Sequence, residues 1–152
     1  MGSLYPGDDP PAPASTEAGA RITGDTQAPA SPGPFVMAAA TLEGDTVVNR
    51  GNEDLGQIQH IMIDVPTGRI AYAVLACGGV FGIGEKLFAV PWGALTLDAD
   101  RRCFVMDIDK SRLERAPGFD KDHWPSMADP EWASAVHEYF RIRPYWNRGD
   151  LQ

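Results

Sequence analysis

The stretch QIQHIMIDVPTGRIAYAVLAC (residues 57–77) decides the fold. It contains two apolar runs, 57–65 and 69–77, separated by Pro66, Thr67 and Gly68. Proline presets the first position of a tight turn, and glycine accepts a positive φ at a later position. The second run is apolar on both faces, which is typical of a strand covered on two sides. The stretch therefore predicts a β-hairpin.

Further short strands are predicted on both sides of this hairpin. DTVVNR (45–50) and CFVMDI (103–108) each predict one strand, and KLFAVPWGALTLD (86–98) predicts one or two. Pro91 has no amide hydrogen, so it marks a bulge, a bend or an edge position. Closely spaced strands with almost no helix between them predict a mainly β fold, and apolar strands favour a small barrel of about five to six strands.

The glycine-rich segment between these strands resembles a phosphate-binding loop only in part. Gly79 and Gly84 have the required separation, but Glu85 follows where a lysine is needed, and Leu87 replaces the magnesium-binding hydroxyl. A strand pattern follows instead of the helix whose amides would face the anion. We therefore interpret the segment as a crossover between strands.

Three apolar residues, Val80, Phe81 and Ile83, fall within this crossover. Apolar side chains in a connection must fold back onto the protein or meet a partner. They are the candidate partner surface that the sequence offers.

The C-terminal third predicts a short helical extension that packs on the barrel. SRLE (111–114) matches a capping box, with Ser111 and Glu114 as its reciprocal partners. Asp129 is a good N-cap with Pro130 at the first helical position, and Pro144 should end that helix. An aromatic and apolar stripe recurs on one face of it: Trp132, Val136, Tyr139 and Phe140. The stripe predicts a packing face.

The chain divides into a tail, a domain and an extension. Residues 1–34 are rich in proline, alanine and small polar residues, which predicts disorder. The barrel domain is expected over 35–116 and the aromatic extension over 117–152.

With 13 basic and 21 acidic residues the net charge is −8, which argues against nucleic acid and anionic membrane surfaces as partners. No stretch is long and apolar enough to span a membrane, so a cytoplasmic location is expected.

Side chains that could carry chemistry are few. Cys77 and Cys103 both lie in apolar runs, where free thiols behave as small hydrophobes, although a disulfide between neighbouring strands stays open. Asp120, Asp122 and His123 offer oxygen and nitrogen ligands for a metal or small ligand, but adjacent acids more often solvate a turn. No catalytic, cofactor or metal site is otherwise predicted, and His137 is expected to be a partly exposed helix residue.

Residues 55–95 resemble a PRC-barrel domain. The shared pattern is Leu55-Gly56, a strand ending in Asp64, the Thr67–Arg69 turn, the glycine pair 78–79 and the strand 86–92. His60 stands where many relatives carry an acidic residue. The tail over 119–132 is similar to the extension of stand-alone bacterial members. The family includes the cytoplasmic domain of the photosynthetic reaction-centre H subunit and the C-terminal domain of the ribosome maturation factor RimM.

The resemblance implies a small β-barrel used for protein–protein contact and assembly, without catalysis, and we expect no cofactor. We therefore expect a non-enzymatic interaction module that binds a protein partner or associates with itself as a homo-oligomer. The alternative is a small-ligand or metal-binding protein that uses Asp120, Asp122 and His123.

Overall fold

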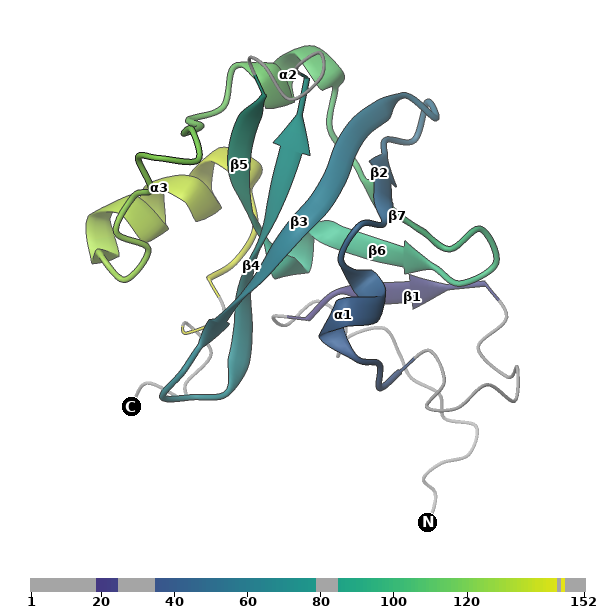
Figure 1. Ribbon diagram of the computed structural model, residues 1–152, viewed down its shortest axis with the longest axis horizontal. Helices are drawn as coiled ribbons and strands as arrows, with labels where there is room; N and C mark the ends of the chain where they lie inside the picture. Colours follow the sequence, from purple (N-terminus) through teal and green to yellow (C-terminus); the bar gives the residue numbers. More distant parts are fainter. Residues whose placement is uncertain (1–18, 25–34, 79–84, 145, 147–152) are drawn as a thin grey trace.

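The computed structural model describes residues 19–24, 35–78, 85–144 and 146. The strands are β1 (Arg21–Thr23), β2 (Thr46–Val48), β3 (Asp54–Asp64), β4 (Arg69–Cys77), β5 (Lys86–Pro91), β6 (Leu95–Asp98) and β7 (Cys103–Met106). The helices are α1 (Ala39–Leu42), the 3-10 helix η3 (Trp92–Ala94), α2 (Lys110–Glu114) and α3 (Pro130–Phe140). The fold is mainly β with short helices (Figure 1).

The predicted hairpin is confirmed as β3 and β4. The two strands pair antiparallel from Gln57 opposite Ala76 to Asp64 opposite Arg69. Gly68 has φ +77°, and its amide donates to the Asp64 carbonyl over 2.8 Å, so the turn needs the glycine that the sequence places there.

The seven strands form one sheet in the order β1-β6-β7-β2-β3-β4-β5. The prediction of a closed barrel of five to six strands is wrong in closure and in strand number, because the end strands β1 and β5 do not pair within the described residues. After β5 the chain leaves the ladder at Pro91, which has no amide hydrogen, and turns through η3 into β6. Because β6 pairs with β7 and β1, the sheet stays open between β5 and β1.

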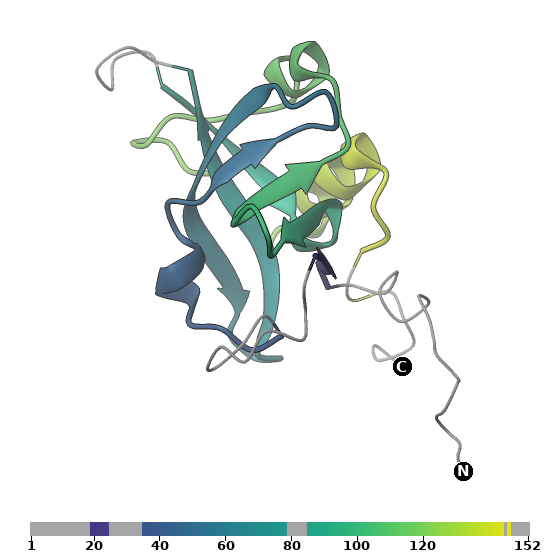
Figure 2. The same cartoon turned by 90° about the vertical axis from the view of Figure 1, so that its right-hand side faces the viewer.

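The open sheet curls around one core. In Figure 1 β4 and β5 run upright and β3 runs obliquely, while β6 and β1 lie roughly horizontally beside them, and Figure 2 shows the same sheet curving back on itself. Two register shifts in the β3–β4 ladder, with Gln59 as the extra residue in β3 and Ala71 as the extra residue in β4, increase bending and twist. Buried residues from β2 to β7 meet inside the curl: Val47, Leu55, Ile58, Ala73, Leu75, Phe88, Val90, Leu95, Leu97, Phe104 and Met106.

Three elements differ from the sequence prediction. Arg21–Thr23, within the segment predicted to be disordered, form β1 and pair parallel with β6. The short helix α1 was not predicted, and its Leu42 joins the core. The helix α2 begins after Asp109 rather than Ser111, so the predicted capping box does not form.

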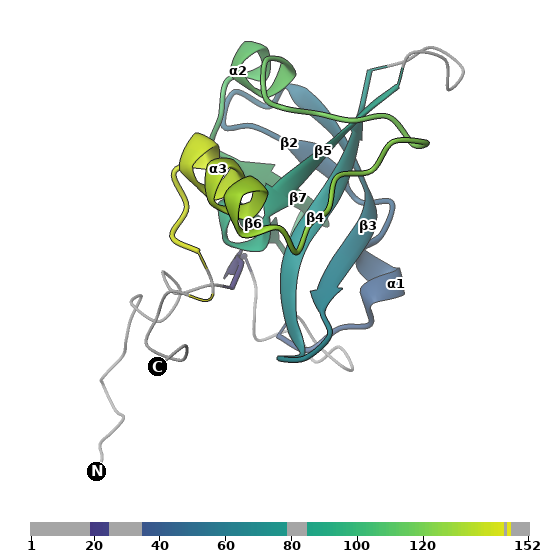
Figure 3. The ribbon, with the colours of Figure 1, turned by 90° about the vertical axis from the view of Figure 1, so that its left-hand side faces the viewer.

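The C-terminal extension covers the outer face of β4 and β5. It begins beside β5, where Leu87 and Phe119 exchange backbone hydrogen bonds of 2.8 and 2.9 Å. The predicted cap of α3 is confirmed, because the Asp129 carboxylate accepts the Glu131 amide over 3.1 Å. The helix ends earlier than predicted, at a left-handed Arg141. Figure 3 shows α3 lying in front of the sheet beside β5.

The predicted packing face of α3 is confirmed. Val136 is buried, and Trp132 and Phe140 pack beside it against the outward-facing side of β4 and β5. Tyr139 holds α3 to α2: its hydroxyl donates to the Arg112 carbonyl over 2.7 Å, and the Arg112 guanidinium donates to the Tyr139 carbonyl over 2.6 Å. β4 is thus buried on both faces, which explains its apolar sequence.

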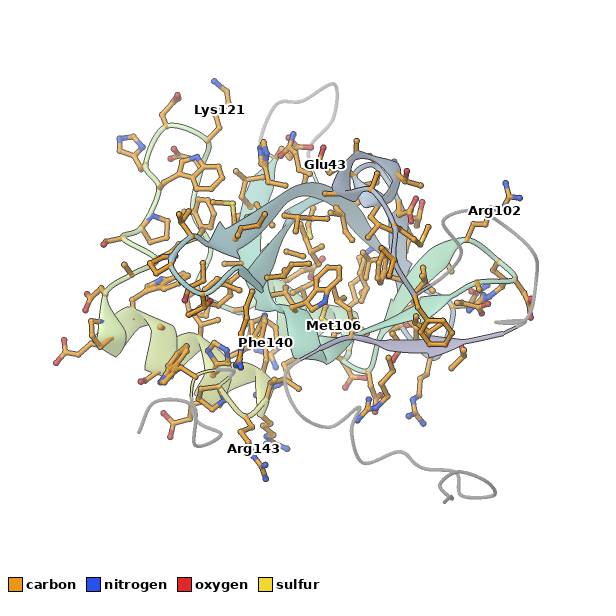
Figure 4. The ribbon with its side chains drawn as sticks, turned by 90° about the horizontal axis from the view of Figure 1, so that it is seen from below. Glu43, Arg102, Met106, Lys121, Phe140 and Arg143 are labelled. Carbon is orange, nitrogen blue, oxygen red and sulfur yellow. The ribbon has the colours of Figure 1, made fainter. Side chains whose placement is uncertain are left out.

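Apolar side chains lie at the centre of the molecule and charged side chains lie at its periphery. Figure 4 shows Met106 among the side chains at the centre of the molecule, with Glu43, Arg102 and Lys121 at the periphery. Both cysteines are free thiols, and the Cys77 Sγ donates to the Leu55 carbonyl over 2.9 Å.

Candidate functional site

The predicted partner residues Val80, Phe81 and Ile83 lie outside the described residues. The strands on either side of them are described, and Cys77 pairs with Lys86 in an antiparallel ladder. The segment therefore joins two neighbouring antiparallel strands, as predicted. A strand follows it, so a phosphate loop, which leads into a helix, does not fit the topology.

The acidic turn at residues 120–123 does not assemble a metal centre. The His123 Nδ1 lies 2.8 Å from the Asp120 carboxylate, and that hydrogen bond lowers the pKa of Asp120 below its ordinary value. The Asp120 carboxylate also accepts the Asp122 amide, while the Asp122 side chain lies 3.6 Å from the Lys121 ammonium. No group of three metal-ligating side chains occurs among the described residues. The geometry is that of an exposed, solvated turn.

His60 has a contact that the sequence did not reveal. Its ring lies 5.5 Å from the ring of Trp124, which in turn lies 5.0 Å from the ring of Phe119. The Trp124 indole N–H donates to the Lys121 carbonyl over 3.0 Å. His60 therefore contacts the C-terminal extension through Trp124 and remains exposed.

His137 is buried, with 3% of its surface exposed, so the prediction of partial exposure is wrong. Its ring lies between Tyr72 of β4, at 5.4 Å, and Trp146, at 4.9 Å, and its Nδ1 is 2.9 Å from the Ala133 carbonyl. Burial disfavours the charged imidazole and lowers the pKa of His137. The prediction rested on the neighbouring Glu138, which is exposed. It missed the contact of the His137 ring with Tyr72, because that contact joins segments far apart in the sequence.

A groove of ≈ 610 Å³ lies where the end of the β3–β4 hairpin faces the start of α3. Residues 62–66 form one side, the segment before α3 and its first turns form the other, and Trp146 also lines it. Buried Ala71 and Ala133 contribute to the lining. Two large apolar side chains on the hairpin side remain exposed: Ile63 at 55% and Val65 at 84%. Its volume lies within the range of about 300–1,000 Å³ that is typical of ligand pockets, and its lining is mostly apolar.

The signal for this groove in the sequence was weak. Ile63 and Val65 share one face of the first predicted strand, as expected for a buried face. In the structure both residues lie at the turn end of the hairpin, where they remain exposed beside the groove.

The sheet edges are the second feature on which a partner could act. β1 and β5 are the end strands, and unpaired edges accept further strands. The edge of β5 already carries a bridge between Leu87 and Phe119. The groove is therefore the stronger candidate.

None of the helices in the described ranges has the length and apolarity needed to cross a membrane.

Comparison with known proteins places these features in a family. The family model described as PRC-barrel domain matches residues 36–113, just over half of the 152-residue chain. No curated protein matches the chain. The chain is similar to a solved structure at 2.46 Å resolution of a 16S ribosomal RNA processing protein RimM from Pseudomonas aeruginosa. The two sequences are 21% identical and the TM-score is 0.34. The match covers 51% of this chain and 47% of that one. The chain thus spans about half the length of that structure.

The family match includes the β3–β4 hairpin and every strand from β2 to β7, and it ends within α2. The motifs at Leu55-Gly56, Thr67–Arg69 and 86–92 all lie inside it. The chain belongs to the PRC-barrel domain family.

Proposed function

We propose that this chain is a non-enzymatic interaction or assembly module that contacts another protein through the groove between the β3–β4 hairpin and α3. The observation that carries the proposal is the exposure of Ile63 and Val65 beside an apolar hollow. Exposed apolar side chains grouped at a concave site favour association, because contact removes their surface from water.

The distribution of the exposed apolar residues supports the groove over other surfaces. The large apolar side chains exposed within the described residues are Phe35, Val36, Ile63, Val65 and Trp124. Of these, only Ile63 and Val65 line the groove, where a partner side chain could also be enclosed.

A matched pair of substitutions tests the proposal. Val65→Asp places a charge at the groove, and Val36→Asp makes the same change at a residue that is 71% exposed and does not line it. Because both residues are exposed, neither change should affect folding by more than about 0.5 kcal/mol. Each variant and the unmodified chain are cross-linked in lysate of the source cells, and the captured proteins are quantified by mass spectrometry.

We expect Val65→Asp to lose a specific captured protein that Val36→Asp retains. Equal capture by all three chains would refute the groove as the contact surface.

A further inference from the structure

We propose that the groove takes a short segment of a partner protein in which apolar side chains are flanked by Lys or Arg. This inference rests on the proposed function and specifies its partner. The occupant is identified by the size, lining and charge of the groove.

The size and lining of the groove select apolar side chains. A volume of ≈ 610 Å³ falls within the range of about 300–1,000 Å³ over which pockets enclose a ligand of several side chains' size. Met62 and Met127 lie on opposite sides of it, and thioether side chains adapt to varied apolar partners. A segment with two or three apolar side chains would fill this space.

The charges at the groove select cations around those apolar side chains. No Lys or Arg lines the groove within the part of the chain that the structure describes. Asp129 and Glu131 are exposed at the start of α3, next to the lining residues Ala128 and Pro130. The amides of the first turn of a helix attract anions. In α3 the Asp129 carboxylate already occupies this position as the cap, so the turn does not favour an anionic partner.

The same charges argue against a second copy of this chain as the occupant. The chain carries a net charge of −8, and two grooves facing each other would bring their acidic rims together. Like charges that meet across an interface oppose association, whereas a cationic segment would be steered toward the rim.

A displayed library of random peptides is the probe for the first experiment. It is selected on the full chain and counted again on Ser134→Trp, which places a large ring at an exposed residue lining the groove. We expect enriched peptides that combine apolar residues with Lys or Arg and that Ser134→Trp no longer binds.

The outcomes separate this inference from the proposed function. Peptides that need the open groove but lack Lys and Arg would overturn the cationic partner and leave the interaction role intact. No enrichment, or enrichment that Ser134→Trp does not change, would overturn both. A dimer of the full chain in light scattering that Ser134→Trp dissociates would replace the cationic partner with a second copy.

The rim charges are tested with the best synthetic peptide from that selection. Asp129→Asn, which keeps a good helix cap, combined with Glu131→Gln should weaken binding about three- to tenfold, and less so at high salt. Glu43→Gln, an exposed carboxylate at the end of α1, is the control and should leave the affinity unchanged. An equal affinity for all of these chains would contradict the role of the rim.

Discussion

Replacing Gly56 with alanine should destabilise this protein more than any other exchange of a glycine for alanine in the β3–β4 hairpin. Gly56 has φ +134°, a conformation that is essentially restricted to glycine and that costs another residue about 2 kcal/mol. A Cβ placed on Gly56 would lie 2.5 Å from the Ala76 carbonyl oxygen and 3.0 Å from the Cys77 Sγ. Because the oxygen belongs to the backbone of β4, the two strands would have to separate.

The magnitude follows from these two contributions. Forcing an extra methyl into a filled space costs about 1–3 kcal/mol, so Gly56→Ala should lower the free energy of unfolding by about 4 kcal/mol in all. Two control variants isolate the parts. Gly68→Ala has a positive φ but no atom within 4 Å, and should cost about 1 kcal/mol. Gly118→Ala has no positive φ but would meet the Leu87 carbonyl oxygen at 2.9 Å, and should cost about 2 kcal/mol.

Urea unfolding followed by tryptophan fluorescence measures all three variants against the unmodified chain. The expected order of destabilisation is Gly56→Ala, then Gly118→Ala, then Gly68→Ala, with the slope of the transition unchanged. A Gly56→Ala variant no less stable than Gly68→Ala would refute the argument from the contact with β4.

Three further predictions rest on single contacts. Burial lowers the pKa of His137 below its ordinary value of 6.5, so as the pH falls the unfolded chain takes up a proton at this residue before the folded chain does. The thermal unfolding temperature should therefore decrease as the pH drops below about 6.5, and it should decrease less in a His137→Leu variant. Burial raises the pKa of Cys77 to about 12, so maleimide at mildly alkaline pH should label it rapidly only in denaturant, as read by peptide mass spectrometry; rapid labelling of the native chain would contradict this. Tyr139→Phe removes the hydroxyl bond to the Arg112 carbonyl and should cost about 1 kcal/mol in urea unfolding, and an unchanged midpoint would show that this bond does not hold α3.

The local elements could be predicted from the sequence because local residues determine them. The β3–β4 turn depends on Pro66 and Gly68, and the start of α3 depends on Asp129 and Pro130, all within a few residues of the structure they specify. In both places turn and cap chemistry agrees with the apolar pattern on either side.

The long-range arrangement could not be predicted in the same way. Whether the sheet closes depends on how β6 leaves β5 after Pro91 and on which strands it then pairs with, and neither is a local property. The pairing of Arg21–Thr23 with β6 joins segments that are far apart in the chain, so composition alone assigned these residues to the tail. The groove forms where the turn end of the hairpin, with exposed Val65, faces the start of α3, and these two segments are far apart in the sequence.

Because β4 is buried on both faces, the unit that folds together is longer than the segment that identifies the family. The residues that identify the family end at 113, but those that cover Tyr72 and Ala89 on the outer face come from the extension, through Trp132 and Val136. A shorter relative with the same curled sheet must cover that face by another element or a partner, or carry polar side chains there. The extension therefore covers the outer face of this sheet. Substitutions in the extension and in the outward-facing residues of β4 should be correlated among members of the family.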